Sequence, residues 1–112
     1  MTTVTIKKKH DHICEVLLMG HAGGGAYGED LVCAALSAIS QTAVLGLNEV
    51  AKIKATFSRD NLKGLLWIAL PDNLTKQQQH DADMILGTMM CGIYDIQKGY
   101  PKLIKTEVTA CL

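Results

Sequence analysis

Short segments in which apolar and polar side chains alternate, or in which β-branched and apolar residues gather, predict β-strands along this chain of 112 residues. Such strands are predicted at residues 2–9, 13–21, 52–58, 62–70 and 103–110. The polar residues 10–12, His-Asp-His, separate the first two strands and predict a hairpin with a tight turn. Residues 59–61 predict a second turn. The regular alternation of residues 52–58 predicts a strand with one wet face.

Two longer segments repeat apolar residues at helical spacing. One helix is predicted over residues 30–50 and another over residues 75–97, where Thr-Lys-Gln-Gln at 75–78 has the form of a capping box. The element order is therefore ββαββαβ. It predicts an α+β fold in which two helices pack on a mixed or mainly antiparallel sheet. At this length, residues 1–112 are expected to form a single domain.

Charge and composition argue against several classes of function. The 11 basic and 11 acidic residues cancel, which does not favour a nucleic-acid surface or binding to an anionic membrane. No apolar run is judged long enough to span a bilayer, and the N-terminal residues lack the order of a signal peptide. We therefore expect a cytoplasmic protein with no direct nucleic-acid or membrane contact. The cysteines at 14, 33, 91 and 111 are widely spaced and are expected to be free thiols.

The stretch GHAGGGAYGEDLVCAALS, residues 20–37, places a glycine-rich loop between a histidine and a cysteine. With Asp30 as the N-cap of the helix, Cys33 falls in its first turn, where free backbone N–H groups favour a thiolate. Cys33 also lies at the border of the apolar stripe, so its thiol can be partly exposed. His21 ends the preceding strand and could accept the thiol proton. A small residue at a helix start, beside a histidine that only hydrogen-bonds the loop, fits these positions as well.

The glycines of this loop allow two further interpretations. Residues 23–28 satisfy the pattern G-x-G-x-x-G, but the preceding hairpin and the wet strand at 52–58 do not fit a doubly wound sheet. The lysine of a P-loop is missing as well. The glycines could instead let the loop close over an extended peptide, with Tyr27 as a contact. A non-catalytic peptide- or nucleotide-binding module that uses residues 22–29 is therefore the alternative to a catalytic pair.

A metal site has a weaker basis. His10, His12 and Cys14 are metal-ligand residue types, and side chains two apart share one face of a strand. The turn predicted at residues 10–12 breaks this alignment, and a fourth ligand is not evident. We expect no metal and no other cofactor.

The residues between Gly20 and Ser37 resemble the signature of the Prp family of ribosomal-processing cysteine proteases. The matching residues are Gly20-His21-Ala22, Tyr27-Gly28, Asp30-Leu31-Val32-Cys33-Ala34-Ala35 and Ser37. Outside this stretch, the resemblance rests on chain length and on the ββαββαβ order. The sequence departs from the signature at Leu31, where isoleucine is frequent, and in its glycine-rich residues 23–25.

The resemblance implies a single cysteine protease domain over residues 1–112. Such a protein is an endopeptidase that removes a short N-terminal extension from a large-subunit ribosomal protein precursor, and it forms a homodimer. The catalytic dyad corresponds to His21 and Cys33, with Asp30 and Ser37 in supporting roles. The mobile loop that shapes substrate access corresponds to Gly20, Gly23, Gly24, Gly25, Tyr27 and Gly28.

Overall fold

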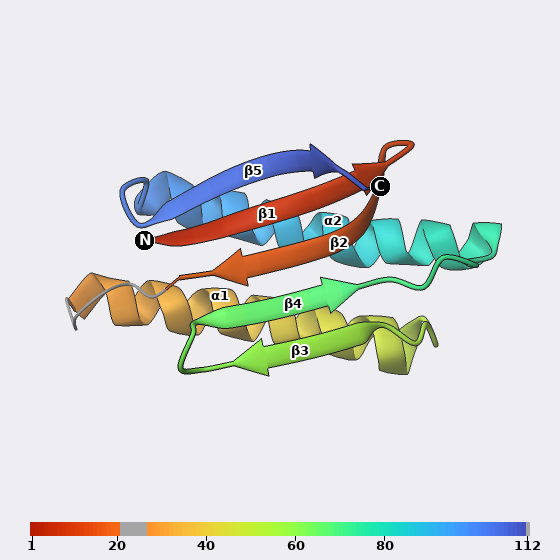
Figure 1. Cartoon of the computed structure of the whole chain (residues 1–112), viewed down its shortest axis with the longest axis horizontal. Helices are drawn as coiled ribbons and strands as arrows, with labels where there is room; N and C mark the ends of the chain where they lie inside the picture. The colour runs from red at the N-terminus through yellow and green to blue at the C-terminus, as the bar shows by residue number, and fades with distance from the viewer. Residues whose placement is uncertain (21–26, 112) are drawn as a thin grey trace.

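The computed structural model describes residues 1–20 and 27–111, and residues 27–30 are described by their backbone alone. The strands are β1 (Thr2–Lys9), β2 (His12–Met19), β3 (Thr56–Asp60), β4 (Leu65–Ala69) and β5 (Ile104–Ala110). Within the described residues they form one five-stranded sheet in the order β3-β4-β2-β1-β5 (Figure 1). β1 and β5 are parallel and the other neighbouring pairs are antiparallel. The sheet is therefore mixed.

The helical segments are α1 (Tyr27–Leu45), a π-helical turn η2 (Gly46–Val50) that follows it directly, and α2 (Lys76–Gly99). Figure 1 shows both helices on the same side of the sheet. The order of strands and helices along the chain is ββαββαβ, with η2 following α1. The predicted α+β fold with two helices packed on a mixed sheet is confirmed.

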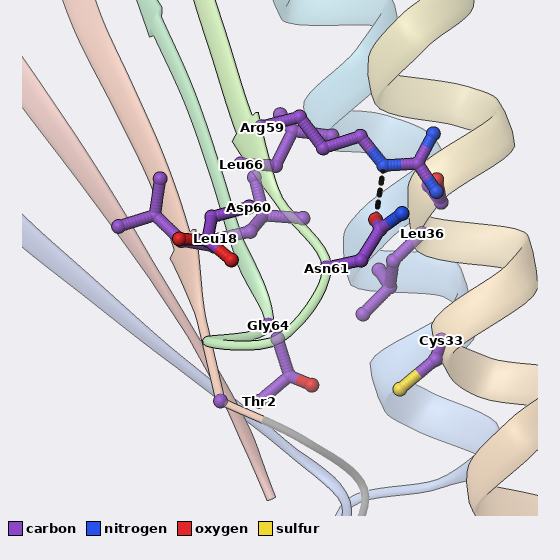
Figure 2. A pocket seen from close by; sticks show the side chains of 12 residues that line it. Thr2, Leu18, Cys33, Leu36, Arg59, Asp60, Asn61, Gly64 and Leu66 are labelled. Atoms are coloured by element: carbon purple, nitrogen blue, oxygen red, sulfur yellow. Dashed lines mark hydrogen bonds between the residues drawn. The ribbon is translucent and has the colours of Figure 1, made fainter.

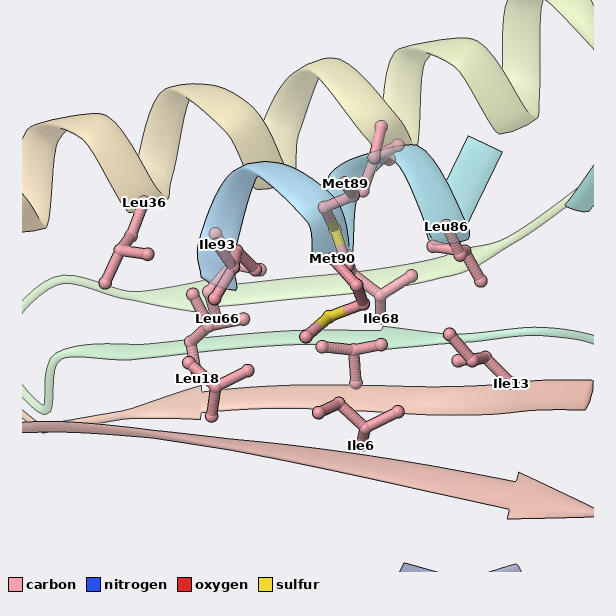
Figure 3. Close-up of a cluster of buried hydrophobic side chains, with 14 of the residues drawn as sticks. Ile6, Ile13, Leu18, Leu36, Leu66, Ile68, Leu86, Met89, Met90 and Ile93 are labelled. Carbon is pink, nitrogen blue, oxygen red and sulfur yellow. The ribbon is translucent and has the colours of Figure 1, made fainter. Parts of the chain in front are cut away.

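The apolar core lies between the sheet and the helix layer (Figure 3). Ile6 and Ile68 reach it from the strands, because side chains two apart along a strand point to the same face of a sheet. Leu36 of α1 and Leu86 and Ile93 of α2 enter the core from the opposite side. Removing these side chains from water is the main favourable contribution to folding.

Two local signals set the element boundaries as predicted. His10 and Asp11 have φ angles of 52° and 65°, the left-handed backbone that suits a tight hairpin turn between β1 and β2. At the start of α2, the Thr75 hydroxyl accepts a hydrogen bond from the Gln78 backbone N–H at 3.1 Å. The Gln78 side chain accepts one from the Thr75 backbone N–H at 3.0 Å. The predicted capping box is confirmed.

The strand predicted at residues 52–58 is wrong over its first half, because β3 begins only at Thr56. Lys52 has a φ of 56°, which turns the chain after η2. The N–H of Ile53 then donates to the Leu47 carbonyl at 2.8 Å, and Ile53 is only 1% exposed. The apparent alternation therefore combines a buried residue at the end of the helix with a true strand.

The expectation of four free thiols is wrong for Cys14 and Cys111, which form a disulfide. β5 runs parallel to β1, and the N–H of Cys111, just after β5, donates to the Lys8 carbonyl at 2.9 Å. The β1–β2 hairpin brings Cys14 to the same end of the sheet. Residues 97 positions apart in the sequence are thus neighbours, which their spacing could not reveal. Cys33 and Cys91 are free.

The segment Leu31–Val50 corrects the expectation that no apolar run is long enough to span a bilayer. Its 20 residues have a mean hydropathy of 1.6, which suffices by length and composition. In the fold, 33% of this window is buried, and Val32, Leu36 and Leu47 are among the core residues. A core helix passes the same test as a membrane span, so hydropathy alone does not place this helix in a membrane.

Candidate active site

A cavity of about 190 Å³ opens between α1 and the sheet, and we call it the Cys33 cavity. Helix α1 contributes Cys33, Leu36 and Ser37 to its wall. Gly20 lines it from just beyond the end of β2, and residues 59–61 and 64, around the β3–β4 turn, form the opposite side. Figure 2 shows the Cys33 sulfur directed from α1 toward the strands. The structure thus brings three predicted site residues, Gly20, Cys33 and Ser37, to one cavity.

Helix α1 holds Cys33 at the edge of its buried face. Val32 and Leu36 are each 2% exposed and anchor this part of the helix in the core. Cys33 is partly exposed, because it is rotated away from that stripe toward the cavity. The predicted border position of this thiol is confirmed. A thiol in this position can meet a substrate without movement of the helix.

The predicted place of Cys33 in the first turn of the helix is wrong. α1 begins at Tyr27, so Asp30 lies inside the helix and cannot be its N-cap. Only the first turn of a helix has N–H groups without partners inside the helix. Cys33 lies one turn further on, where the effect of the helix end has fallen off. The helix start is therefore not a basis for assigning Cys33 a catalytic role.

The predicted loop lies partly outside the described residues. His21, Gly23, Gly24 and Gly25 lie outside the described residues, so their roles stay predictions. Tyr27 and Gly28 were predicted in the loop, but their backbone belongs to the first turn of α1. Their predicted contacts with a substrate, and the supporting role of Asp30, also stay predictions.

Ser37 lies one helical turn beyond Cys33 and lines the same cavity. Its hydroxyl oxygen accepts a hydrogen bond from the Gln41 side-chain amide at 2.6 Å. The Gln41 amide thus occupies one lone pair of the Ser37 oxygen. The hydroxyl proton is left to point toward another acceptor, so Ser37 can act as a donor in the cavity.

Gly20 has a structural requirement that the sequence pattern did not reveal. Its φ of 114° lies in a region that residues with a side chain rarely adopt. A Cβ atom at this position would overlap the carbonyl oxygen of Met1. The Gly20 N–H donates to the Gly64 carbonyl at 3.0 Å, which ties the end of β2 to the β3–β4 turn. Its predicted substrate contact is untested.

The β3–β4 turn contributes residues to the cavity that the sequence analysis missed. One Asp60 oxygen accepts hydrogen bonds from the backbone N–H groups of Leu62 and Lys63, at 3.0 and 3.2 Å. The Arg59 Nε donates to the Asn61 side-chain oxygen at 2.7 Å. These bonds fix the conformation of the turn. The turn predicted at residues 59–61 is misplaced, because β3 continues to Asp60 and the turn occupies residues 61–64, before β4 begins at Leu65. The sequence also did not indicate that this turn lies beside Cys33.

The candidate metal ligands are used differently. Among the described residues, His, Cys, Asp and Glu side chains do not gather in groups of three that could hold a metal ion. The His12 Nδ1 instead lies 2.7 Å from an Asp83 carboxylate oxygen, and Cys14 is in the disulfide. These contacts fasten the β1–β2 hairpin to α2 and to the end of β5.

A partly exposed cysteine at an open cavity, on a two-layer α+β fold, defines a site of the kind used by thiol-dependent enzymes. The family model of the cysteine protease Prp matches residues 1–105. The ribosomal processing cysteine protease Prp of Staphylococcus aureus (strain Mu50) is 30% identical over 109 residues, which cover 94% of this chain and 96% of that protein. The protein of the same name from Bacillus subtilis (strain 168) is 26% identical over 101 residues, covering 89% and 90%.

The fold agrees with these sequence matches. The crystal structure of the ribosomal processing protease Prp from S. aureus, in complex with a substrate peptide, superposes with a TM-score of 0.85 at 26% identity. The superposition covers 97% of this chain and 100% of the S. aureus chain. The chain belongs to the cysteine protease Prp family. It is a ribosomal processing cysteine protease, so a non-catalytic binding module is not its best interpretation.

Proposed function

We propose that this protease removes an N-terminal extension from the precursor of a large-subunit ribosomal protein. Cys33 is the nucleophile and His21 the general base. The observation that carries this proposal is the location of Cys33 in the wall of an open cavity. Gly20, the residue before His21, lines the same cavity. Because ribosomal proteins are made in the cytoplasm, we propose that the protein acts there.

The proposed reaction proceeds through an acyl-enzyme. The Cys33 sulfur attacks the scissile carbonyl carbon while its proton passes to the His21 imidazole. The C–N bond then breaks, and the same proton moves to the leaving amine. Water, deprotonated by His21, hydrolyses the thioester and restores the thiol. Polar groups of the cavity wall, with Ser37 among them, surround the carbonyl oxygen as it gains charge.

We also propose that a second copy of the chain covers the groove between the helices, which we call the helix groove. It has a volume of about 660 Å³. Its lining is uncharged and consists of Ala38, Ile39, Thr42, Ala43, Gly46, Met84, Ile85, Thr88, Met89 and Gly92. Met84 is 56% exposed at its edge. Only 33% of the apolar window Leu31–Val50 is buried in one chain, and a second copy would remove more of its surface from water.

A cleavage assay tests the proposed activity. The purified protein is incubated with the ribosomal protein precursor from the same genome, and the products are identified by intact mass. We expect one cut, at the end of the extension, by the unmodified protein and none by Cys33→Ala or His21→Ala. The precursor without its extension serves as the control and should stay intact. Cleavage by either variant at the rate of the unmodified protein would refute the proposed dyad.

A further inference from the structure

Arg59 is the cation in the wall of the Cys33 cavity. Among the described residues that line this cavity, Arg59 and Asp60 are the charged ones. Figure 2 shows the Arg59 side chain extending from the end of β3 toward α1, whereas the Asp60 side chain points to the other side of the strand. Neighbouring residues of a strand point to opposite faces. The positive charge is therefore directed across the space between the turn and the helix.

The carboxylate of Asp60 does not neutralise Arg59. Its Oδ1 accepts the backbone N–H groups of Leu62 and Lys63. Among the described residues, the ion pairs do not include Arg59. A guanidinium group at the mouth of a cavity that has no carboxylate partner among the described residues attracts an anionic ligand.

The Arg59 side chain is also oriented. Its Nε donates to the Asn61 side-chain oxygen at 2.7 Å, and Asn61 belongs to the turn fixed by Asp60. The Gly20 N–H donates to the Gly64 carbonyl at 3.0 Å and fastens that turn to the end of β2. With Nε engaged, the two terminal nitrogens of the guanidinium remain as a fork, the geometry that binds a carboxylate with two hydrogen bonds.

From these observations we propose that Arg59 is a specificity-determining residue that binds a carboxylate group of the peptide in the Cys33 cavity. This inference rests on the proposed protease function. Two groups of a peptide have this chemistry: an acidic side chain near the scissile bond, and the C-terminal carboxylate that cleavage creates. In the first case Arg59 selects the substrate. In the second it holds the product.

Two sets of peptides distinguish the sources. The first set spans the cleavage site of the precursor and carries Glu or Gln at each position in turn, and kcat/KM is measured for each pair. The second set consists of the N-terminal product with a free C-terminal carboxylate or a C-terminal amide, tested as inhibitors. We expect the carboxylate form to be preferred about tenfold in one of the two sets, the size expected for a hydrogen bond to a charged group.

Substitutions at Arg59 and at the nearby Lys63 test which residue causes the preference for a carboxylate. Arg59→Gln should abolish the preference for the carboxylate, and Arg59→Lys should keep part of it, because a lysine retains the charge without the fork. Lys63→Gln is the matched control. Lys63 is an exposed cation in the turn that follows β3 and it does not line the cavity, so its variant should keep the full preference.

The outcomes separate this inference from the function on which it rests. If the unmodified protein cuts the precursor and neither peptide set shows a preference, the role of Arg59 is refuted while the protease function stands. The role is also refuted if Arg59→Gln weakens all peptides equally, or keeps the preference. If no peptide or precursor is cut and Cys33 is intact, the proposed function itself fails.

Discussion

The Cys33 cavity and the helix groove share helix α1 but are built from different parts of the chain. The cavity is assembled from helix α1, parts of the four strands β1 to β4 and the β3–β4 turn, and its lining includes a thiol, hydroxyl groups and an arginine. Among the described residues, the groove is lined by α1, η2 and α2, and none of the side chains in its lining is charged. The cavity thus offers chemistry and the groove offers apolar surface. We propose that helix α1 serves the reaction with one side and the association of two chains with another.

This difference predicts that the two regions can be disabled separately. A substitution in the Cys33 cavity should change cleavage and leave the association of the chains intact. A substitution in the helix groove should change association first. Each of the following variants is paired with a control in the other region or at a neutral position.

The largest effect is expected for Cys33→Ala, which removes the proposed nucleophile. Cleavage should fall by about a thousandfold or more, as it does when the nucleophile of a hydrolase is removed. The side chain is small and partly exposed, so thermal stability and oligomeric mass should stay unchanged. Rates are measured by intact mass and association by light scattering.

Cys91→Ala is the control, because Cys91 is also a free cysteine but is exposed on α2 away from the cavity. It should cleave at the rate of the unmodified protein. If Cys91→Ala lost activity while Cys33→Ala kept it, the Cys33 cavity would not be the active site.

Gly20→Ala is expected to disturb the cavity through its backbone. The φ of 114° and the overlap of a Cβ with the Met1 carbonyl should lower the free energy of unfolding by about 1–3 kcal/mol. The cavity wall would shift with it, so cleavage should also slow. Urea unfolding measures the stability and the peptide assay measures the rate.

Gly87→Ala is the matched glycine control. Gly87 is inside α2, and among the described residues outside its own stretch of helix no atom lies within 4 Å of a Cβ built there. Alanine should therefore raise the free energy of unfolding by about 0.5–1 kcal/mol, because it is the better helix former. A Gly20→Ala variant as stable as this one would show that the end of β2 tolerates a side chain.

Met84→Glu tests the helix groove. Burying a carboxylate in the uncharged lining of the proposed interface is costly, so we expect the dissociation constant of the proposed dimer to rise at least about tenfold. Met84 is 56% exposed in one chain, so the stability of the isolated chain should change little. Sedimentation over a range of concentrations measures the association.

Val108→Glu is the control for this variant, since Val108 is 57% exposed on the edge strand β5. It should leave the dimer intact. If Val108→Glu dissociated the proposed dimer and Met84→Glu did not, the interface would lie at the edge of the sheet and not in the helix groove.

The parts of the fold that the sequence predicted depend on neighbours in the chain. Both polar residues of the capping box, Thr75 and Gln78, lie within three positions of one another, and the structure places them as predicted. Strand β1 has the predicted bounds for the same reason, because alternation is a local pattern. The strand prediction failed at Ile53 because this buried residue packs at the end of a helix and is hydrogen-bonded to Leu47, not to a strand.

The candidate site was less predictable because it depends on contacts between distant segments. The sequence placed Cys33 on the border of the helix stripe, which is a local property. Arg59 and Asn61 entered the cavity only because β4 pairs with β2, so that the turn before β4 lies beside Gly20. The disulfide between Cys14 and Cys111 likewise depends on the pairing of β5 with β1. Strand order has no signal in a single sequence.

The smallest effect is expected for Ser37→Ala, which tests whether a hydroxyl in the Cys33 cavity takes part in the reaction. The variant should lower kcat about three- to tenfold, as expected for the loss of one hydrogen bond of about 1 kcal/mol. It also removes the hydrogen bond from Gln41. Gln41→Ala removes that same bond but keeps the hydroxyl in the cavity, so we expect its kcat to stay unchanged.

The pair separates a role in the reaction from a role in the helix. Both variants should lose a similar, small part of the free energy of unfolding, because both lack the 2.6 Å bond between these side chains. Only Ser37→Ala should lower kcat. Equal losses of kcat in the two variants would mean that Ser37 supports α1 and not the chemistry, and the polar character of the Cys33 cavity would then rest on Cys33 and the β3–β4 turn.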